Sequence, residues 1–180
     1  MKPSIKVATC GICTAISVVL LFFGGVIYIF AYVVPIVLGI LMMMLKKSLK
    51  TSSAVSVYVA TSLLSFMIVP DKETVLLYVL FFGYYPIIKA SLDKIKPKFI
   101  SVLVKILLFN VSLTIIELLC VYVFGIPFFD EGVFSISLLI MFAVLMNVLF
   151  AMYEYILKHS LIIYEKKFEK RVLRFLKGKR

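Results

Sequence analysis

The segment VATCGICTAISVVLLFFGGVIYIFAYVVPIVLGILMMML, residues 7–45, decides the fold because it is apolar along its whole length. A membrane-spanning helix needs about 20 consecutive apolar residues, so this block is too long for a single span. Gly24-Gly25 and Pro35 interrupt it, and both are sites where helices tend to break. The segment therefore predicts spans at about 7–23 and 27–45, joined by a very short or partly re-entrant connection.

The composition of the whole chain also indicates a membrane protein. Hydrophobic residues make up 63% of the 180 residues and charged residues 16%, and the mean hydropathy is +1.14. Soluble domains contain roughly 45–50% apolar residues, and a water-soluble fold of this length could not bury so much apolar surface. In lipid, spanning segments must be helices or a closed barrel, because no water satisfies unpaired backbone groups. The apolar runs are continuous rather than alternating, which favours an all-α polytopic helix bundle.

Four further apolar runs follow the first block and bring the predicted number of transmembrane helices to six. The clearest division between them is PDKE at 70–73, a helix breaker followed by three charges. We therefore divide the chain into a six-helix transmembrane domain, residues 1–157, and a basic cytoplasmic tail, residues 158–180. The four further spans are expected at about 52–69, 74–92, 99–125 and 133–157.

The distribution of positive charge predicts the orientation in the membrane. Lysines and arginines precede the first span, follow the second and the fourth, and fill the tail. The other connections carry Lys72 as their only basic residue, beside the acidic residues Asp71, Glu73, Asp130 and Glu131. Because basic loops remain cytoplasmic, we expect both termini in the cytoplasm and the chain in the cell membrane.

The formal charge of +11 does not indicate nucleic-acid binding, because the basic residues lie at membrane edges rather than on one soluble module. The tail contains apolar residues at helical spacing: Leu161, Tyr164, Phe168, Val172 and Phe175. This pattern predicts an amphipathic helix on a lipid bilayer with an anionic inner leaflet. A solvated tail, or a tail that docks on a protein partner, is the alternative.

Polar and ionisable residues inside the predicted spans are the candidate functional residues, because a charge in hydrocarbon is costly unless it faces a bundle interior or a cavity. Glu117, toward the outer half of the fifth span, is the strongest candidate. Asn110 lies seven residues earlier, on nearly the same helix face. The alternative role of Glu117 is an interhelical hydrogen bond, for example to Asn147 in the sixth span.

Two lysines and a second glutamate fall nearer the inner ends of the spans. We interpret Lys89 and Lys105 as anchors whose long stems let the ammonium groups reach the lipid headgroups. Glu154 is expected to pair with Lys158, four residues later in the same helix. Pro86 is expected to kink the fourth helix just before Lys89.

Tyrosines in the outer halves of the spans suggest an outer cavity around Glu117. An aromatic belt at the membrane interface is the alternative explanation of these tyrosines. The ligand-binding candidates are therefore Glu117, Asn110, Tyr78, Tyr122 and Asn147.

No enzyme motif occurs in the chain. It lacks a phosphate-binding glycine loop, an HExxH motif and a GxSxG motif. Cys10 and Cys13 form a CGIC pair, which supplies only half of a tetrahedral zinc site, and the single histidine, His159, lies in the tail. We therefore expect no enzymatic activity, no cofactor and no metal.

Small residues recur in the first helix at three- and four-residue spacing, at Ala8, Gly11 and Ala15. Such a face allows another helix to approach closely. Together with six predicted spans and two cytoplasmic termini, it resembles the substrate-binding S components of energy-coupling factor (ECF) vitamin transporters. The resemblance implies a subunit that binds a vitamin or other metabolite, and whose small-residue face docks on a transmembrane coupling subunit driven by ATPases.

The resemblance also implies an outward substrate pocket, around Tyr78, Glu117 and Tyr122. S components close that pocket with a substantial first outer loop, which is almost absent here. The layout also resembles small membrane proteins of Gram-positive bacteria, for which it implies no activity but favours a bacterial cytoplasmic membrane. A non-transporting membrane scaffold or assembly protein is the second hypothesis, motivated by the basic tail.

Overall fold

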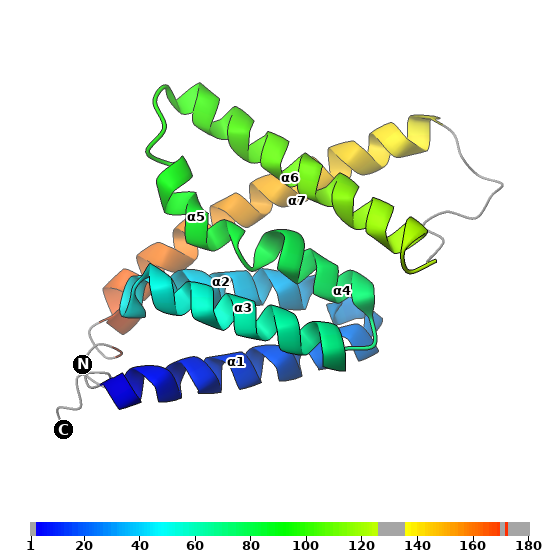
Figure 1. Ribbon diagram of the computed structural model, residues 1–180. Helices are drawn as coiled ribbons and strands as arrows, with labels where there is room; N and C mark the ends of the chain where they lie inside the picture. Colours follow the sequence, from blue (N-terminus) through cyan, green and yellow to red (C-terminus); the bar gives the residue numbers. More distant parts are fainter. Residues whose placement is uncertain (1–2, 126–135, 170–171, 173–180) are drawn as a thin grey trace.

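The computed structural model describes residues 3–125, 136–169 and 172 (Figure 1). Every regular element within these residues is a helix, which confirms the all-α prediction. Five helical stretches are long and apolar enough to cross a membrane, as a multi-pass membrane protein requires. These stretches are Ser4–Val26, Thr51–Ile68, Lys72–Leu92, Lys98–Tyr122 and Ile140–Phe168.

The long apolar block forms two helices, but they divide later than predicted. Helix α1 covers Pro3–Val26, the 3₁₀ turn η1 covers Tyr28–Phe30, and α2 covers Val33–Leu49. With 17 residues, α2 rises by only about 25 Å at 1.5 Å per residue. The hydrocarbon core is about 30 Å thick. The six-span count therefore stays a prediction.

Gly24 and Gly25 lie inside α1 and do not end it. Their missing side chains allow Val34 and Asp71 to pack closely against the helix. A Cβ on Gly25 would lie 2.9 Å from the Cβ of Asp71, and a Cβ on Gly24 would lie 3.1 Å from the Cβ of Val34. Pro35 lies in the first turn of α2, where its missing N–H has no partner to lose. The end of α1 therefore packs closely against the first turn of α2.

The third and fourth predicted spans correspond to α3 and to a helix in three parts. Helix α3, Thr51–Ile68, packs between α1 and α2 (Figure 1). The next span consists of α4, Lys72–Leu77, the π-helical segment η2, Tyr78–Phe82, and α5, Tyr85–Leu92. Asp71 begins it by accepting hydrogen bonds from the backbone N–H groups of the second and third residues of α4.

The kink predicted at Pro86 occurs as a break three residues earlier. Pro86 lies in the first turn of α5, and the preceding Gly83 joins η2 to α5. A Cβ on Gly83 would lie 2.7 Å from the ring of Tyr58, so glycine lets α3 approach this break. The Tyr58 hydroxyl donates a hydrogen bond to the Val79 carbonyl at 2.7 Å, which satisfies one of the backbone groups near the π-helical segment.

Helices α6, Lys98–Tyr122, and α7, Ile136–Ile163, cross each other on one side of the bundle (Figure 1). Helix α7 continues past the predicted boundary at residue 157 into the π-helical segment η3, Tyr164–Phe168. The buried Tyr164 side chain packs on the bundle. Of the predicted amphipathic tail, the part beyond Glu169 lies outside the described residues except for Val172.

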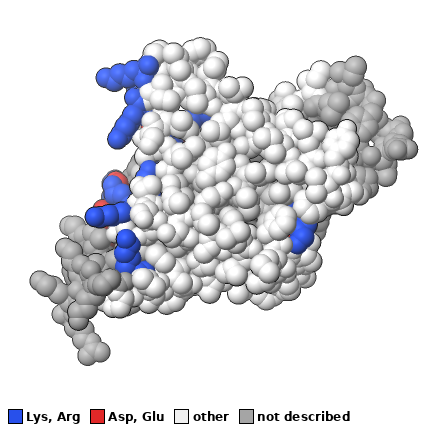
Figure 2. Space-filling view, viewed as in Figure 1, with Lys and Arg blue, Asp and Glu red and all other residues white. Residues whose placement is uncertain are grey.

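Most of the lysines that are visible in Figure 2 gather at one end of the bundle, and residues without charge cover most of the surface between the two ends. Exposed apolar side chains such as Leu107 suit a lipid-facing surface. We call one end, with Lys46, Lys47, Lys89, Lys94 and Lys98, the basic end. The opposite end, with Asp71, Glu73 and Glu117 beside Lys72, is the acidic end.

Candidate functional site

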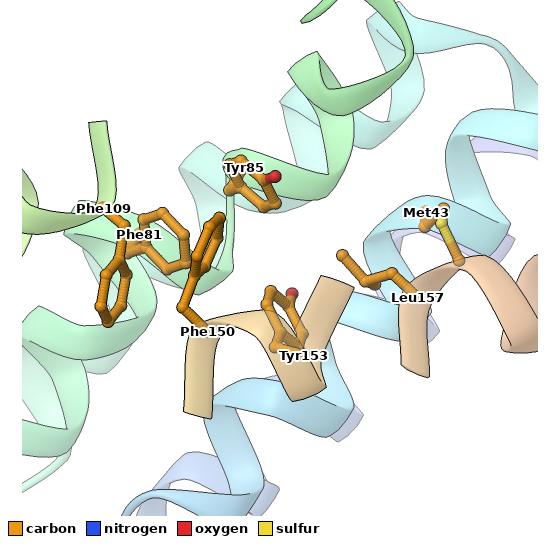
Figure 3. Close-up of a cluster of buried hydrophobic side chains, with 7 residues drawn as sticks. All are labelled: Met43, Phe81, Tyr85, Phe109, Phe150, Tyr153 and Leu157. Atoms are coloured by element: carbon orange, nitrogen blue, oxygen red, sulfur yellow. The ribbon is translucent and has the colours of Figure 1, made fainter. Parts of the chain in front are cut away.

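An aromatic cluster from η2, α5, α6 and α7 fills the middle of the bundle (Figure 3). Phe109 and Phe150 stack with their ring centroids 4.9 Å apart, and Phe81 stacks on Tyr85 at 4.7 Å. Phe81 also meets Phe109 edge to face at 5.0 Å. Tyr153 completes the cluster and is almost fully buried. Such aromatic pairs are worth about 0.5–1.5 kcal/mol beyond their buried area.

A cavity of about 260 Å³ extends from this aromatic cluster toward the acidic end. Its described wall comes from η1–α2, α4, η2, α6 and α7 and is almost entirely apolar. Two carboxylates, Glu73 and Glu117, are the only charged side chains in that wall. We call this space the acidic-end cavity. Its principal apolar wall residues are Leu77, Phe81, Phe82, Phe109, Ile116 and Phe150.

The two carboxylates of the acidic-end cavity have different surroundings. Glu73 Oε1 accepts a hydrogen bond from the Tyr32 hydroxyl at 2.5 Å. Glu117 is half-buried and accepts no hydrogen bond from any residue that the structure describes. Glu73 lies in the first turn of α4 and Glu117 near the end of α6, and both line this cavity at the same end of the bundle. Glu117, the leading candidate from the sequence, therefore lines the acidic-end cavity.

The structure does not bring the other predicted ligand-binding residues to this cavity. Tyr78 is fully buried in a separate cluster with Leu21, Leu38, Val69 and Val75. The Tyr122 side chain is 81% exposed at the end of α6 and does not line the cavity.

Asn110 and Asn147 form a reciprocal pair between α6 and α7. Each side-chain amide donates to the other, at 3.0 and 3.1 Å. Asn147 therefore bonds to Asn110 rather than to Glu117, the alternative considered from the sequence. The pair joins the crossing helices in a region where lipid offers no competing hydrogen bonds.

Replacing Asn147 by alanine is expected to lower the free energy of unfolding in detergent by about 1 kcal/mol, because one interhelical amide pair is lost. The Asn110→Ala variant should show a similar loss, and the double variant less than the sum, since both changes remove the same pair. Thr114→Ala is a matched control, because among the described residues the Thr114 hydroxyl bonds only within its own helix, to the Asn110 backbone carbonyl at 2.9 Å. Additive losses measured by thermal unfolding would contradict the pairing.

An ion cluster of Lys89, Asp93, Lys105 and Glu154 lies on the basic-end side of the aromatic cluster. Glu154 Oε2 lies 2.5 Å from Lys89 Nζ and 3.2 Å from Lys105 Nζ. Asp93 contacts Lys105 as well and lies 3.6 Å from Lys89. The Tyr85 hydroxyl donates to Glu154 Oε1. Two positive and two negative groups thus balance each other while joining α5, α6 and α7.

This cluster was missed from the sequence. The sequence predicts separate membrane anchors at Lys89 and Lys105, and it predicts a pair between Glu154 and Lys158. In the structure, the Glu154 carboxylate forms ion pairs with Lys89 and Lys105 instead. The available signal was depth: all three side chains lie within about two helical turns of the predicted inner ends of three neighbouring spans.

A second cavity, of about 570 Å³, opens at the basic end beside the ion cluster. Several charged groups in its wall already have partners. Lys46 Nζ donates to the Ile87 carbonyl at 2.6 Å, and Lys47 forms an ion pair with Glu165 at 2.7 Å. The acidic-end cavity, where Glu117 has no partner among the residues that the structure describes, is therefore the stronger candidate for a ligand site. Among the described residues no group of histidine, cysteine, aspartate and glutamate side chains could hold a metal ion.

Known proteins provide no further assignment. The chain matches no protein-family model, and it has no significant match among curated proteins or solved structures.

Proposed function

We propose that this chain is a membrane-embedded, small-molecule-binding subunit of a transporter, comparable in role to an ECF S component. The observation that carries the proposal is the acidic-end cavity: an apolar space inside the bundle with two carboxylates in its wall. Ligand sites are typically concave, mostly apolar and equipped with a few polar groups that fix orientation. Its volume of about 260 Å³ lies slightly below the roughly 300–1,000 Å³ typical of such sites, which favours a small metabolite.

The proposal includes the topology and the location. Counting α2 as a span gives six transmembrane helices with both termini in the cytoplasm of a bacterial cell. The basic end then faces the anionic inner leaflet, where each lysine near the surface contributes about 1 kcal/mol. The acidic-end cavity lies toward the outside, where a substrate would enter.

The proposal also includes a partner for α1. Ala8, Gly11 and Ala15 are exposed on this helix, and a Cβ on Gly11 would meet no other atom within 4 Å. A close helix approach from a transmembrane coupling subunit is compatible with this surface. ATPases bound to that subunit would supply the energy, since the chain has no nucleotide-binding motif of its own.

Affinity purification from native membranes in mild detergent, followed by mass spectrometry, tests this function. We expect an ATPase pair and a transmembrane coupling subunit to copurify with the tagged chain. Recovery of other membrane proteins without ATPases would favour the scaffold or assembly function and contradict the transporter assignment.

Substituting Gly11 by tryptophan is expected to reduce the recovery of the coupling subunit at least tenfold, because the indole would prevent close helix approach. The stability of the isolated chain should stay unchanged, since nothing lies within 4 Å of the new Cβ. Leu107→Trp, at a 60% exposed position on α6, is the control and should retain the partner. Equal recovery with both variants would show that α1 does not dock.

A further inference from the structure

The acidic-end cavity combines an apolar body with an excess of negative charge. Glu73 and Glu117 line it, and no lysine or arginine does so among the residues that the structure describes. Lys72, the basic residue next to Glu73 in the sequence, does not line the cavity. Its ammonium donates to the carbonyls of Phe66 and Val69 at 2.9 and 2.8 Å and lies 5.5 Å from the centroid of the Phe66 ring.

Asp71, a third carboxylate at this end, caps the N-terminus of α4 through two backbone N–H groups and does not line the cavity. Glu73 retains acceptor capacity beyond its hydrogen bond from Tyr32. Glu117 has no donor at all within the described part of the chain. A half-buried carboxylate in an apolar wall is stabilised when a cation pairs with it, and the described residues supply no such cation to Glu117.

The apolar wall of the cavity suits the rest of a ligand. Phe81, Phe109 and Phe150 form a packed aromatic surface at the inner end of the cavity. Figure 3 shows their rings gathered together, beside Tyr153. Aromatic faces bind apolar groups, and they also attract cations through their negative π faces.

We propose that the acidic-end cavity binds a small organic cation, an amine with an apolar or aromatic body. The ammonium group lies at Glu117 and Glu73, and the apolar body packs against Phe81, Phe109 and Phe150. This inference rests on the proposed function and specifies the substrate class of the same site. An anionic ligand would meet two carboxylates without a compensating base, and a neutral apolar ligand would leave Glu117 unpaired.

Three probes of nearly equal size and different charge test the proposal: 2-phenylethylamine, 2-phenylethanol and 3-phenylpropanoate. Binding of each radiolabelled probe to the full chain is measured with protein immobilised in a nonionic detergent. We expect 2-phenylethylamine to bind at least tenfold more tightly than either of the other two, because charge-assisted hydrogen bonds exceed neutral ones.

The variants Glu117→Gln and Glu73→Gln should each weaken binding of the amine about tenfold or more, and should remove its advantage over the alcohol. Glu165→Gln is the matched control. Glu165 lies on η3, forms an ion pair with Lys47 of α2, and does not line the cavity. Thermal unfolding of each variant establishes that it is folded.

The outcomes separate this inference from the proposed function. Tighter binding of the alcohol or the acid, or unchanged amine binding by Glu117→Gln, would overturn the cation preference while leaving a small-molecule site. Failure of all three probes to bind the wild-type chain would contradict both.

Discussion

Replacing Glu154 by glutamine is expected to lower the free energy of unfolding by about 3–5 kcal/mol. Glu154 lies between Lys89 and Lys105, whose side chains are only 12% and 8% exposed. Without its charge, Asp93 alone must balance two poorly solvated ammonium groups. Removing one member of a buried ion pair costs more than the pair contributes, because the partner stays buried and unpaired.

Thermal unfolding in detergent, followed by circular dichroism, measures this effect, which corresponds to a midpoint lower by roughly 10 °C for a chain of this size. Glu165→Gln is the control, because its ion pair with Lys47 is about 40% exposed and such surface pairs contribute about 0–1 kcal/mol. Adding Lys105→Gln to Glu154→Gln should give a smaller loss than the sum of the single variants. Equal midpoints for the Glu154→Gln and Glu165→Gln variants would show that the ion cluster does not hold α5, α6 and α7 together.

The second large effect is expected at Gly39, in the middle of α2. A Cβ at this position would lie 2.1 Å from the Tyr153 hydroxyl oxygen and 2.8 Å from the Phe82 carbonyl oxygen. Both atoms belong to the packed centre of the bundle, so the backbone of α2 must move to accept a methyl group. We expect Gly39→Ala to lose about 3 kcal/mol of stability, the upper part of the usual range for overpacking.

Gly11→Ala provides the comparison for this prediction, because a Cβ there meets nothing and alanine is the better helix former. That variant should unfold at or above the wild-type midpoint. Tyr153→Phe should partly rescue Gly39→Ala, since it removes the hydroxyl that is closest to the new methyl group. A Gly39→Ala variant as stable as Gly11→Ala would contradict the packing of α2 against α7.

The helical class and the approximate positions of the spans follow from the sequence because they depend on local hydrophobicity. The sequence predicts the boundary between α1 and α2 too early, since the pair Gly24-Gly25 resembles a helix break. Their actual role is close packing against Val34 and Asp71, which is a tertiary contact and leaves no local signal. Pro35 also suggests a break from the sequence, but it lies in the first turn of α2, where proline is well tolerated.

The candidate site was predictable only in part. Glu117 stands out in the sequence because a carboxylate within an apolar run is costly, and it does line the acidic-end cavity. Glu73 lies in a polar stretch and gives no such signal. The sequence also does not reveal which face each helix presents, and so Tyr78 and Tyr122 were grouped with Glu117 although one is buried elsewhere and the other is exposed.

The proposed function depends on an acidic-end cavity that is open to water on the outer side of the membrane. Labelling of single cysteines in intact cells tests this directly, with a membrane-impermeant thiol reagent that carries an ammonium group. The background replaces Cys10, Cys13 and Cys120 by serine, and the two test positions are Glu117→Cys and Lys158→Cys. We predict that Glu117→Cys reacts in intact cells and that Lys158→Cys reacts only after permeabilisation. Reaction of Lys158→Cys from outside, or of Glu117→Cys only after permeabilisation, would contradict the account.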